Sequence, residues 1–211
     1  MGGTAQPAMH NIIFQDEHLL ILNKPAWLLA VPGRGEDKQD CLWIRVRRDF
    51  PDALVVHRLD MATSGLMVFA RCIEMQRALS NLFQLRQVFK RYEAVVTGRM
   101  EQVAGEINLP IGADWSQRPK RQIDAVGGKP ALTRFHQLDV CDESTRVALE
   151  PVTGRTHQLR LHLAAIGHPI FGDALYGDAS SAPRLLLHAC ALGFTHPATG
   201  KALCIEHASP F

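Results

Sequence analysis

Short apolar runs separated by polar or glycine-rich stretches predict a chain built mainly from strands. Residues 19–22 read Leu-Leu-Ile-Leu without a polar break, which is typical of a buried strand. Residues 131–140 and 145–150 alternate apolar and polar positions, and this alternation predicts an antiparallel pair. Further strand-like runs occupy residues 54–56, 66–70, 92–96, 185–195 and 203–207.

Three segments have the spacing of an amphipathic helix. Apolar residues recur on one face over residues 42–50 and again over residues 75–83. A shorter helix is expected to carry Leu159, Leu163 and Ile166 on its apolar face, with Thr156 as its N-cap and Gly167 as its C-terminal stop. Strands and helices do not alternate regularly enough for a doubly wound sheet. We therefore expect an α+β fold, a mixed and mainly antiparallel sheet with flanking helices.

The chain has 211 residues, which is the length of one large domain. Its 46% hydrophobic and 21% charged residues are ordinary for a globular protein and exclude the disordered class. No internal linker is evident. We expect a flexible tail over residues 1–11 and one domain over residues 12–211.

Targeting and metal-binding signals are absent from the sequence. No stretch is long and apolar enough for a membrane helix, and the N-terminus lacks the basic start and apolar core of a secretory signal. The five cysteines form no CxxC pair, so we expect free thiols in a reducing cytoplasm. There is no P-loop, dinucleotide fingerprint, HExxH or GxSxG motif. His157 and His162 are five residues apart, a poor spacing for a metal pair on one helix face.

The net charge of +2 is too small to identify a partner, but the charges are unevenly placed. Basic residues outnumber acidic ones over residues 118–134, whereas acidic residues prevail over residues 139–150. Two further basic clusters lie at residues 45–48 and 86–91. A basic face of this kind fits a nucleic-acid footprint. On charge alone, solvated surfaces that happen to cluster explain the pattern equally well.

Asp60 is the first candidate for chemistry. It lies in a loop between two apolar strands, followed by Thr63, Ser64 and Gly65. Loops held between strands commonly carry catalytic groups. The alternative is an aspartate that only caps a turn through its own backbone.

Arg155, His157 and Arg160 form a second candidate group, at the start of the predicted short helix. Helix N-termini attract anions, and the arginines add full charges. Arg160 could pair with a carboxylate from another segment. Beside Asp60 it would keep the carboxylate ionised and orient it through two parallel hydrogen bonds. The alternative is a phosphate or surface contact.

Tyr92 follows Lys90 and Arg91 at the head of a predicted strand. A tyrosine in this position can stack on a base while neighbouring cations hold phosphate. The alternative is a core tyrosine flanked by solvated charges.

These candidates belong to longer strings that resemble a known family, the RluA-type pseudouridine synthases. The string HRLDMATSGLMVFA at residues 57–70 resembles the catalytic motif of that family. Four further strings resemble its other motifs in the same order: LLILNKPAWLLAVPG at 19–33, KRY at 90–92, PVTGRTHQLRLHLAAIGHPIFGDALYG at 151–177 and RLLLHA at 184–189. The segment LPIGADWSQRPKRQ at 109–122 is similar to the small members that act on both 23S ribosomal RNA and tRNA. About a dozen residues precede the first motif, too few for the S4 RNA-binding domain of many relatives.

The resemblance implies the fold of a pseudouridine synthase catalytic domain and an activity that isomerises uridine in structured RNA. It implies that Asp60 is the essential aspartate, that Tyr92 packs on the target base and that Arg160 forms a salt bridge with Asp60. It also implies that Arg58 enters the RNA stack and that Leu186 or Leu187 lines the base pocket. The further RNA-binding residues that we expect are His57, Lys90, Arg118, Lys120, Arg121, Arg155 and His157.

The implied reaction needs no redox step and no external group, so we expect no metal and no cofactor. RNA is the expected partner, bound by a cytoplasmic monomer without an obligatory protein partner or membrane. Asp60 could act as a nucleophile, or could remove a proton from C2′. Two other functions stay open: a catalytically silent RNA-binding module, and a carboxylate hydrolase. The hydrolase would need a second acid or a metal, which the sequence does not show.

Overall fold

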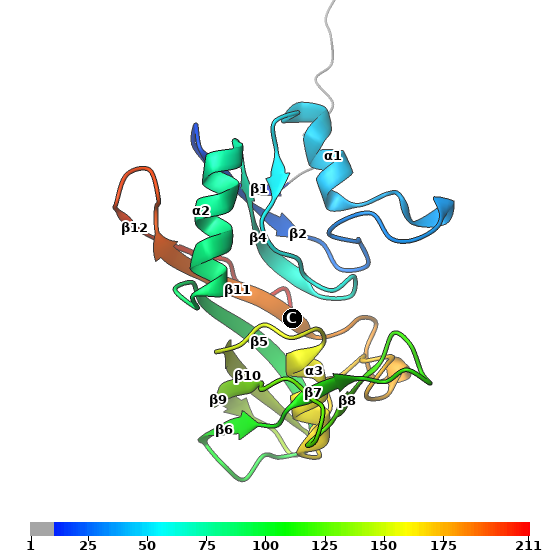
Figure 1. Ribbon diagram of the computed structural model, residues 1–211. Helices are drawn as coiled ribbons and strands as arrows, with labels where there is room; N and C mark the ends of the chain where they lie inside the picture. Colours follow the sequence, from blue (N-terminus) through cyan, green and yellow to red (C-terminus); the bar gives the residue numbers. More distant parts are fainter. Residues whose placement is uncertain (1–10) are drawn as a thin grey trace, which may run out of the picture.

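A ten-stranded sheet runs through the whole molecule (Figure 1). The computed structural model describes residues 11–211. Its main path is β1-β2-β4-β11-β5-β10-β9-β6, with β12 paired to β11 and β3 paired to β4. Among the described strands every pairing is antiparallel except that between β4 and β11. The predicted α+β fold with a mixed, mainly antiparallel sheet is confirmed.

We call one part of the molecule the α1/α2 half. Its strands are β1 (Asn11–Gln15), β2 (Leu19–Lys24), β3 (Leu54–Val55), β4 (Ser64–Ala70), β11 (Leu187–Thr195) and β12 (Ala202–Glu206). Its helices are α1 (Leu42–Asp49) and α2 (Ile73–Gln84), which Figure 1 shows flanking these strands, and a short 3-10 helix covers Glu36–Lys38. The predicted tail over residues 1–11 lies outside the described residues except for Asn11, which begins β1.

Alternation along β2 explains why two helices flank this half. Leu20 and Leu22 belong to the core cluster that contains α1, whereas Leu19 and Ile21 belong to the cluster that contains α2. Successive side chains of a strand point to opposite faces, so a strand apolar at every position requires a cover on both. The uninterrupted apolar run therefore predicts a two-sided burial, which the structure confirms.

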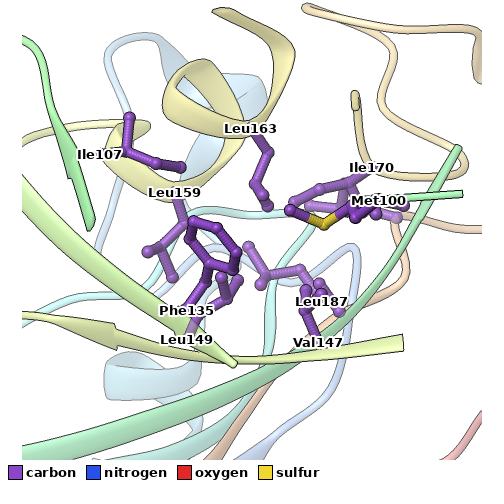
Figure 2. Close-up of a cluster of buried hydrophobic side chains, with 12 residues drawn as sticks. Met100, Ile107, Phe135, Val147, Leu149, Leu159, Leu163, Ile170 and Leu187 are labelled. Atoms are coloured by element: carbon purple, nitrogen blue, oxygen red, sulfur yellow. The ribbon is translucent and has the colours of Figure 1, made fainter. Parts of the chain in front are cut away.

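The other part is the α3 half. Its strands are β5 (Phe89–Thr97), β6 (Ala104–Asn108), β9 (Leu132–Val140) and β10 (Ser144–Pro151), covered by α3 (Gln158–Ala165). A core cluster joins the sheet to α3 through Phe135, Val147, Leu149, Leu159 and Leu163 (Figure 2). Two short strands, β7 (Ile111–Ala113) and β8 (Arg121–Ile123), form a separate hairpin that contacts α3. A second 3-10 helix covers Ala179–Ser181.

The start of α3 differs from the prediction. His157, not Thr156, is the N-cap, and its backbone is left-handed with φ of 58°. His157 offers no capping hydrogen bond; the side chain of Gln158 instead accepts one from the backbone N–H of Arg155. Gly167 ends the helix as predicted, with φ of 86° and its N–H bonded to Ala164. The His157 side chain thus has no capping role, and it lines the cleft between the two halves.

None of the helices over residues 11–211 has the length and apolar character needed to span a lipid bilayer.

Candidate active site

A cleft of about 520 Å³ lies where the two halves meet. It is lined by the loop before β4, the first residues of β5, the β10–α3 connection and the start of α3. Most of the predicted site residues line it: His57, Arg58, Asp60, Lys90, Tyr92, Arg155, His157, Arg160 and Leu187. Residues from four distant segments of the chain therefore meet in one cavity.

Asp60 lies in the loop between β3 and β4, and its side chain is 29% exposed. The carbonyl of Asp60 accepts a hydrogen bond from the N–H of Thr63 at 3.1 Å, which closes a turn. Gly65, just beyond, has φ of 119°, and a Cβ there would lie 2.4 Å from the backbone of Ala189. The close parallel contact of β4 with β11 thus fixes the end of the loop, while the Asp60 carboxylate stays open to the cleft.

Arg160 reaches Asp60, but its two parallel hydrogen bonds go elsewhere. Its NH1 lies 3.6 Å from Oδ2 of Asp60. Its Nε and NH2 donate to both carboxylate oxygens of Asp173, at 2.8 and 2.6 Å. The predicted salt bridge is present, whereas the expected bidentate pairing with Asp60 is wrong. Asp173 is the fully buried anion of the site, and Asp60 is only partly buried.

Asp173 orients Arg160 because its own position is fixed. Its Oδ1 also accepts hydrogen bonds from the backbone N–H groups of Leu175 and Tyr176. These bonds and the guanidinium lower the pKa of Asp173 in spite of its burial, which by itself raises it. Asp173 in turn raises the pKa of Arg160. The guanidinium is held as a cation whose third nitrogen faces Asp60.

His157 approaches Asp60 from the same side, with Nε2 at 3.9 Å from Oδ2. Its Nδ1 lies 2.8 Å from the hydroxyl of Tyr176, and that hydroxyl accepts a hydrogen bond from the backbone N–H of Arg121. Burial lowers the pKa of His157. A neutral ring that accepts the Tyr176 proton at Nδ1 carries its own proton at Nε2, the nitrogen that faces Asp60.

Tyr92 lies in β5 at the junction of the two halves, because it packs against core clusters of both. Burial, and then the negative charge of Asp60, raise the pKa of its phenol. The ring is therefore a neutral wall of the cleft beside the carboxylate.

Lys24 is a buried lysine, close enough to Asp60 to feel its charge, that the sequence did not assign to the site. Its Nζ donates to the carbonyls of Pro25, Leu28 and Met61 at 2.8, 2.8 and 3.1 Å. Burial lowers its pKa to about 7, although the charge of Asp60 raises it. The bond to Met61, the residue after Asp60, ties the loop that carries Asp60 to the end of β2.

Burial affects two of the predicted RNA contacts, and one of them, His57, is also engaged by the protein itself. The ring of His57 stacks on Phe83 with centroids 4.6 Å apart, and its Nε2 accepts from the N–H of Val68. Burial lowers the pKa of His57 to about 3, so this histidine is neutral. Burial, followed by the charge of Arg86, also lowers the pKa of Lys90.

Four predicted residues do not line the cleft. Leu186 packs against the core cluster of the α3 half, and Leu187 supplies the cleft wall instead. Arg118, Lys120 and Arg121 lie on the β7–β8 hairpin, outside the lining of the cleft. Arg121 is close enough to lower the pKa of His157 through its charge.

The described residues contain no group of three or more potential metal ligands. All five cysteines are free, as the sequence predicted.

Comparison with known proteins decides the family. A model of the RNA pseudouridylate synthase family matches residues 18–165. The chain belongs to this family. It is an RNA pseudouridine synthase, an enzyme that isomerises uridine to pseudouridine in RNA.

Individual members are similar over almost their whole length. The dual-specificity RNA pseudouridine synthase RluA of Escherichia coli strain K12 is 44% identical over 204 residues, which cover 95% of this chain and 93% of that protein. The protein of the same name from Haemophilus influenzae is 46% identical over 205 residues, covering 95% and 94%. Among solved structures, human RNA pseudouridylate synthase domain containing 1 is similar with a TM-score of 0.81 and 28% identity, covering 100% of this chain and 87% of that one.

Sequence reasoning did not assign Lys24, Asp173 or Tyr176 to the site. A lysine separated by one asparagine from the apolar run at residues 19–22 is a signal for the first, because a buried ammonium group needs several acceptors. The acid and the tyrosine are close together in the string FGDALYG at 171–177, after the helix that carries Arg160. Only the fold shows that this string returns to the helix start.

Proposed function

We propose that Asp60 carries the isomerisation and that Arg160 positions it. The observation that supports this is the 3.6 Å approach of Arg160 to a partly exposed carboxylate in a cleft. In this proposal Arg160 is a positioning residue, because Asp173 holds its guanidinium in place. The cation balances the charge of Asp60 and selects the direction in which its free oxygens point.

The target uridine must leave its stack to reach Asp60. Unstacking costs a few kcal/mol, which contacts with the protein have to offset. Arg58 is exposed at the cleft and would fill the gap in the RNA, while Tyr92 would pack on the extruded base. Leu187 would close the pocket from β11.

The chemistry is an internal rearrangement of one nucleotide. The bond from N1 of uracil to C1′ breaks, the base rotates, and a bond forms from C5 to C1′. The proton on C5 is lost and N1 gains one, so atoms and electrons balance without another reactant. A carboxylate beside a fixed guanidinium can attack as a nucleophile or accept the proton from C2′.

We propose stem-loops of 23S ribosomal RNA and tRNA as substrates. Support comes from the relatives named for dual specificity and from the basic side chains that border the cleft. Arg155, Lys90 and the β7–β8 hairpin would contact phosphates and set the register of the RNA. We further propose a monomer that acts in the cytoplasm, where these RNAs are found, with no obligatory protein partner. Gel filtration with light scattering checks the oligomeric state.

The decisive test is Asp60→Asn, which keeps the size of the side chain and removes its charge. We expect turnover to fall below about one-thousandth of the wild-type rate while RNA binding changes little. Asp40→Asn is the matched control, because Asp40 is an exposed aspartate paired with Arg45 and outside the cleft. Pseudouridine mapping of ribosomal RNA and tRNA, in cells with and without the gene, reports activity and targets together.

Near-normal turnover in Asp60→Asn would overturn the assignment of Asp60. An unchanged pseudouridine map in cells without the gene would overturn the proposed RNA substrates.

A further inference from the structure

The tip of the β7–β8 hairpin carries a large apolar side chain in solvent. Trp115 is 75% exposed, although tryptophan is mostly covered in folded proteins. The tip covers residues 114–120, between the last residue of β7 and the first of β8. An aromatic ring left open in this way is a candidate contact surface.

A neighbouring side chain covers one face of the Trp115 ring. The guanidinium of Arg118 lies over its ring, 4.2 Å from the ring centroid. A cation over one face of an indole leaves the other face free for a flat partner. Arg118 and Lys120 also give the tip two positive charges next to the ring.

The tip is held in one shape by its own hydrogen bonds. Oδ1 of Asp114 accepts from the N–H groups of Ser116 and Gln117, and the N–H of Lys120 donates to the carbonyl of Gln117. The carboxylate of Asp114, the acidic residue of the tip, is thus hydrogen-bonded to the backbone. A preorganised aromatic face loses little entropy when a base stacks on it.

The hairpin is joined to the active site by a short chain of contacts. The N–H of Arg121, the residue after the tip, donates to the hydroxyl of Tyr176. That hydroxyl contacts Nδ1 of His157, and Nε2 of His157 faces Asp60 at 3.9 Å. These contacts place β8, the second strand of the hairpin, beside the start of α3, and Figure 1 shows the β7–β8 hairpin next to α3.

We propose that Trp115 and Arg118 form a stacking platform for an unpaired base near the target uridine. The inference rests on the proposed RNA substrate and adds a specificity-determining contact to it. The basic charges of the tip, and the contact of the adjoining strand β8 with Tyr176 near His157, favour an RNA base over an apolar protein segment. Stacking of this kind selects loops with an unpaired base at one distance from the uridine, because a paired base has no free face.

The test measures binding of a labelled RNA stem-loop, the tRNA anticodon arm, to the full chain in the Asp60→Asn background. Trp115→Leu removes the aromatic face and is expected to raise Kd about tenfold. Trp115→Phe is expected to retain most of the affinity. Leu138→Ala, at an exposed apolar position on β9, is the control and is expected to bind normally.

Salt dependence separates stacking from phosphate contacts. Trp115→Leu removes no charge, so the slope of log Kd against log salt stays the same. Lys120→Ala should make that slope shallower by about one.

An abasic scan identifies the base. Single abasic nucleotides are placed along the RNA loop. At one position, the abasic nucleotide should raise the Kd of the protein with wild-type Trp115 about as much as Trp115→Leu raises the Kd of the intact RNA. At that position alone, Trp115→Leu should add no further loss. The inference would be overturned if Trp115→Leu weakened RNA binding further by the same factor at every abasic position. It would also be overturned if Trp115→Leu changed neither Kd in the Asp60→Asn background nor kcat/KM in the otherwise wild-type enzyme. If the otherwise wild-type chain formed no pseudouridine in this RNA, the proposed substrate would fail instead.

Discussion

The helices α2 and α3 pack on the same sheet but bury different kinds of side chain. The buried residues of α2 are Met75 and Leu79, both apolar. The buried residues of α3 include Gln158, Arg160 and His162, each at most 5% exposed. A helix that buries polar groups needs a partner for each of them, whereas an apolar face needs only a complementary surface.

The partners of α3 come from several other segments. The amide of Gln158 accepts from Thr153 and donates to the carbonyl of Leu132. His162 contacts Thr133 on β9 and the carbonyl of Leu109. These bonds fix the rotation of α3 about its axis, and that rotation is what aims Arg160 at Asp60. The difference teaches that the buried apolar face of α2 stabilises the fold, while the polar burial of α3 orients Arg160.

The largest expected effect is on Arg160. Arg160→Leu leaves the buried carboxylate of Asp173 without its cation, and we expect a loss of about 3–5 kcal/mol in the free energy of unfolding. Turnover should fall by about 100-fold or more, because Asp60 loses its orientation. Urea unfolding and single-turnover kinetics measure the two effects.

A double variant separates the effect of Arg160 on stability from its effect on turnover. Arg160→Leu with Asp173→Asn removes both charges but keeps an acceptor for the N–H groups of Leu175 and Tyr176. Stability should recover in part while kcat stays low and KM changes little. Recovery of kcat along with stability would show that Arg160 acts only on the fold.

Leu79→Ala is the matching change in α2. Leu79 is fully buried, so the variant loses about 3 kcal/mol of stability through the cavity it leaves. At a temperature where the variant is folded, its kcat/KM should equal that of the wild type. A specific loss of turnover in the folded variant would contradict the division of roles between the two helices.

Stability should depend on pH through His57, which stacks on Phe83 of α2. Burial lowers its pKa from 6.5 to about 3. Between these two values His57 is protonated in the unfolded chain and neutral in the folded chain. The contribution of His57 to the free energy of unfolding is complete above about pH 6.5. It decreases by about 1.4 kcal/mol per pH unit as the pH falls toward 3. The urea unfolding midpoint should depend less steeply on pH in His57→Leu than in the wild type across this range. An equally steep dependence in the variant would contradict the assignment of this effect to His57.

The smallest effect is expected at Ile73, the first residue of α2, which is 44% exposed. Ile73→Ala should change stability by no more than about 0.5 kcal/mol. A larger loss, measured by the same urea titration, would mean that the exposed face of α2 also carries packing that the division between the helices does not include.

The sequence by itself determined the alternation of buried strands, the α+β class and the loop that carries Asp60. Local patterns were sufficient there, because side-chain periodicity and turn chemistry act over a few residues. The same patterns placed Tyr92 in a strand and Arg160 at a helix start, and the structure brings both to the cleft, although β5 begins at Phe89, three residues before Tyr92.

Tertiary structure alone decided how the charges pair. Arg160 has two carboxylates within reach, and the sequence could not show that the bidentate pairing goes to Asp173 and not to Asp60. Likewise, Lys24 reaches Met61 only because β2 and β4 pair side by side. Such choices depend on distances of a few ångströms between segments far apart in the chain, and no local pattern encodes them.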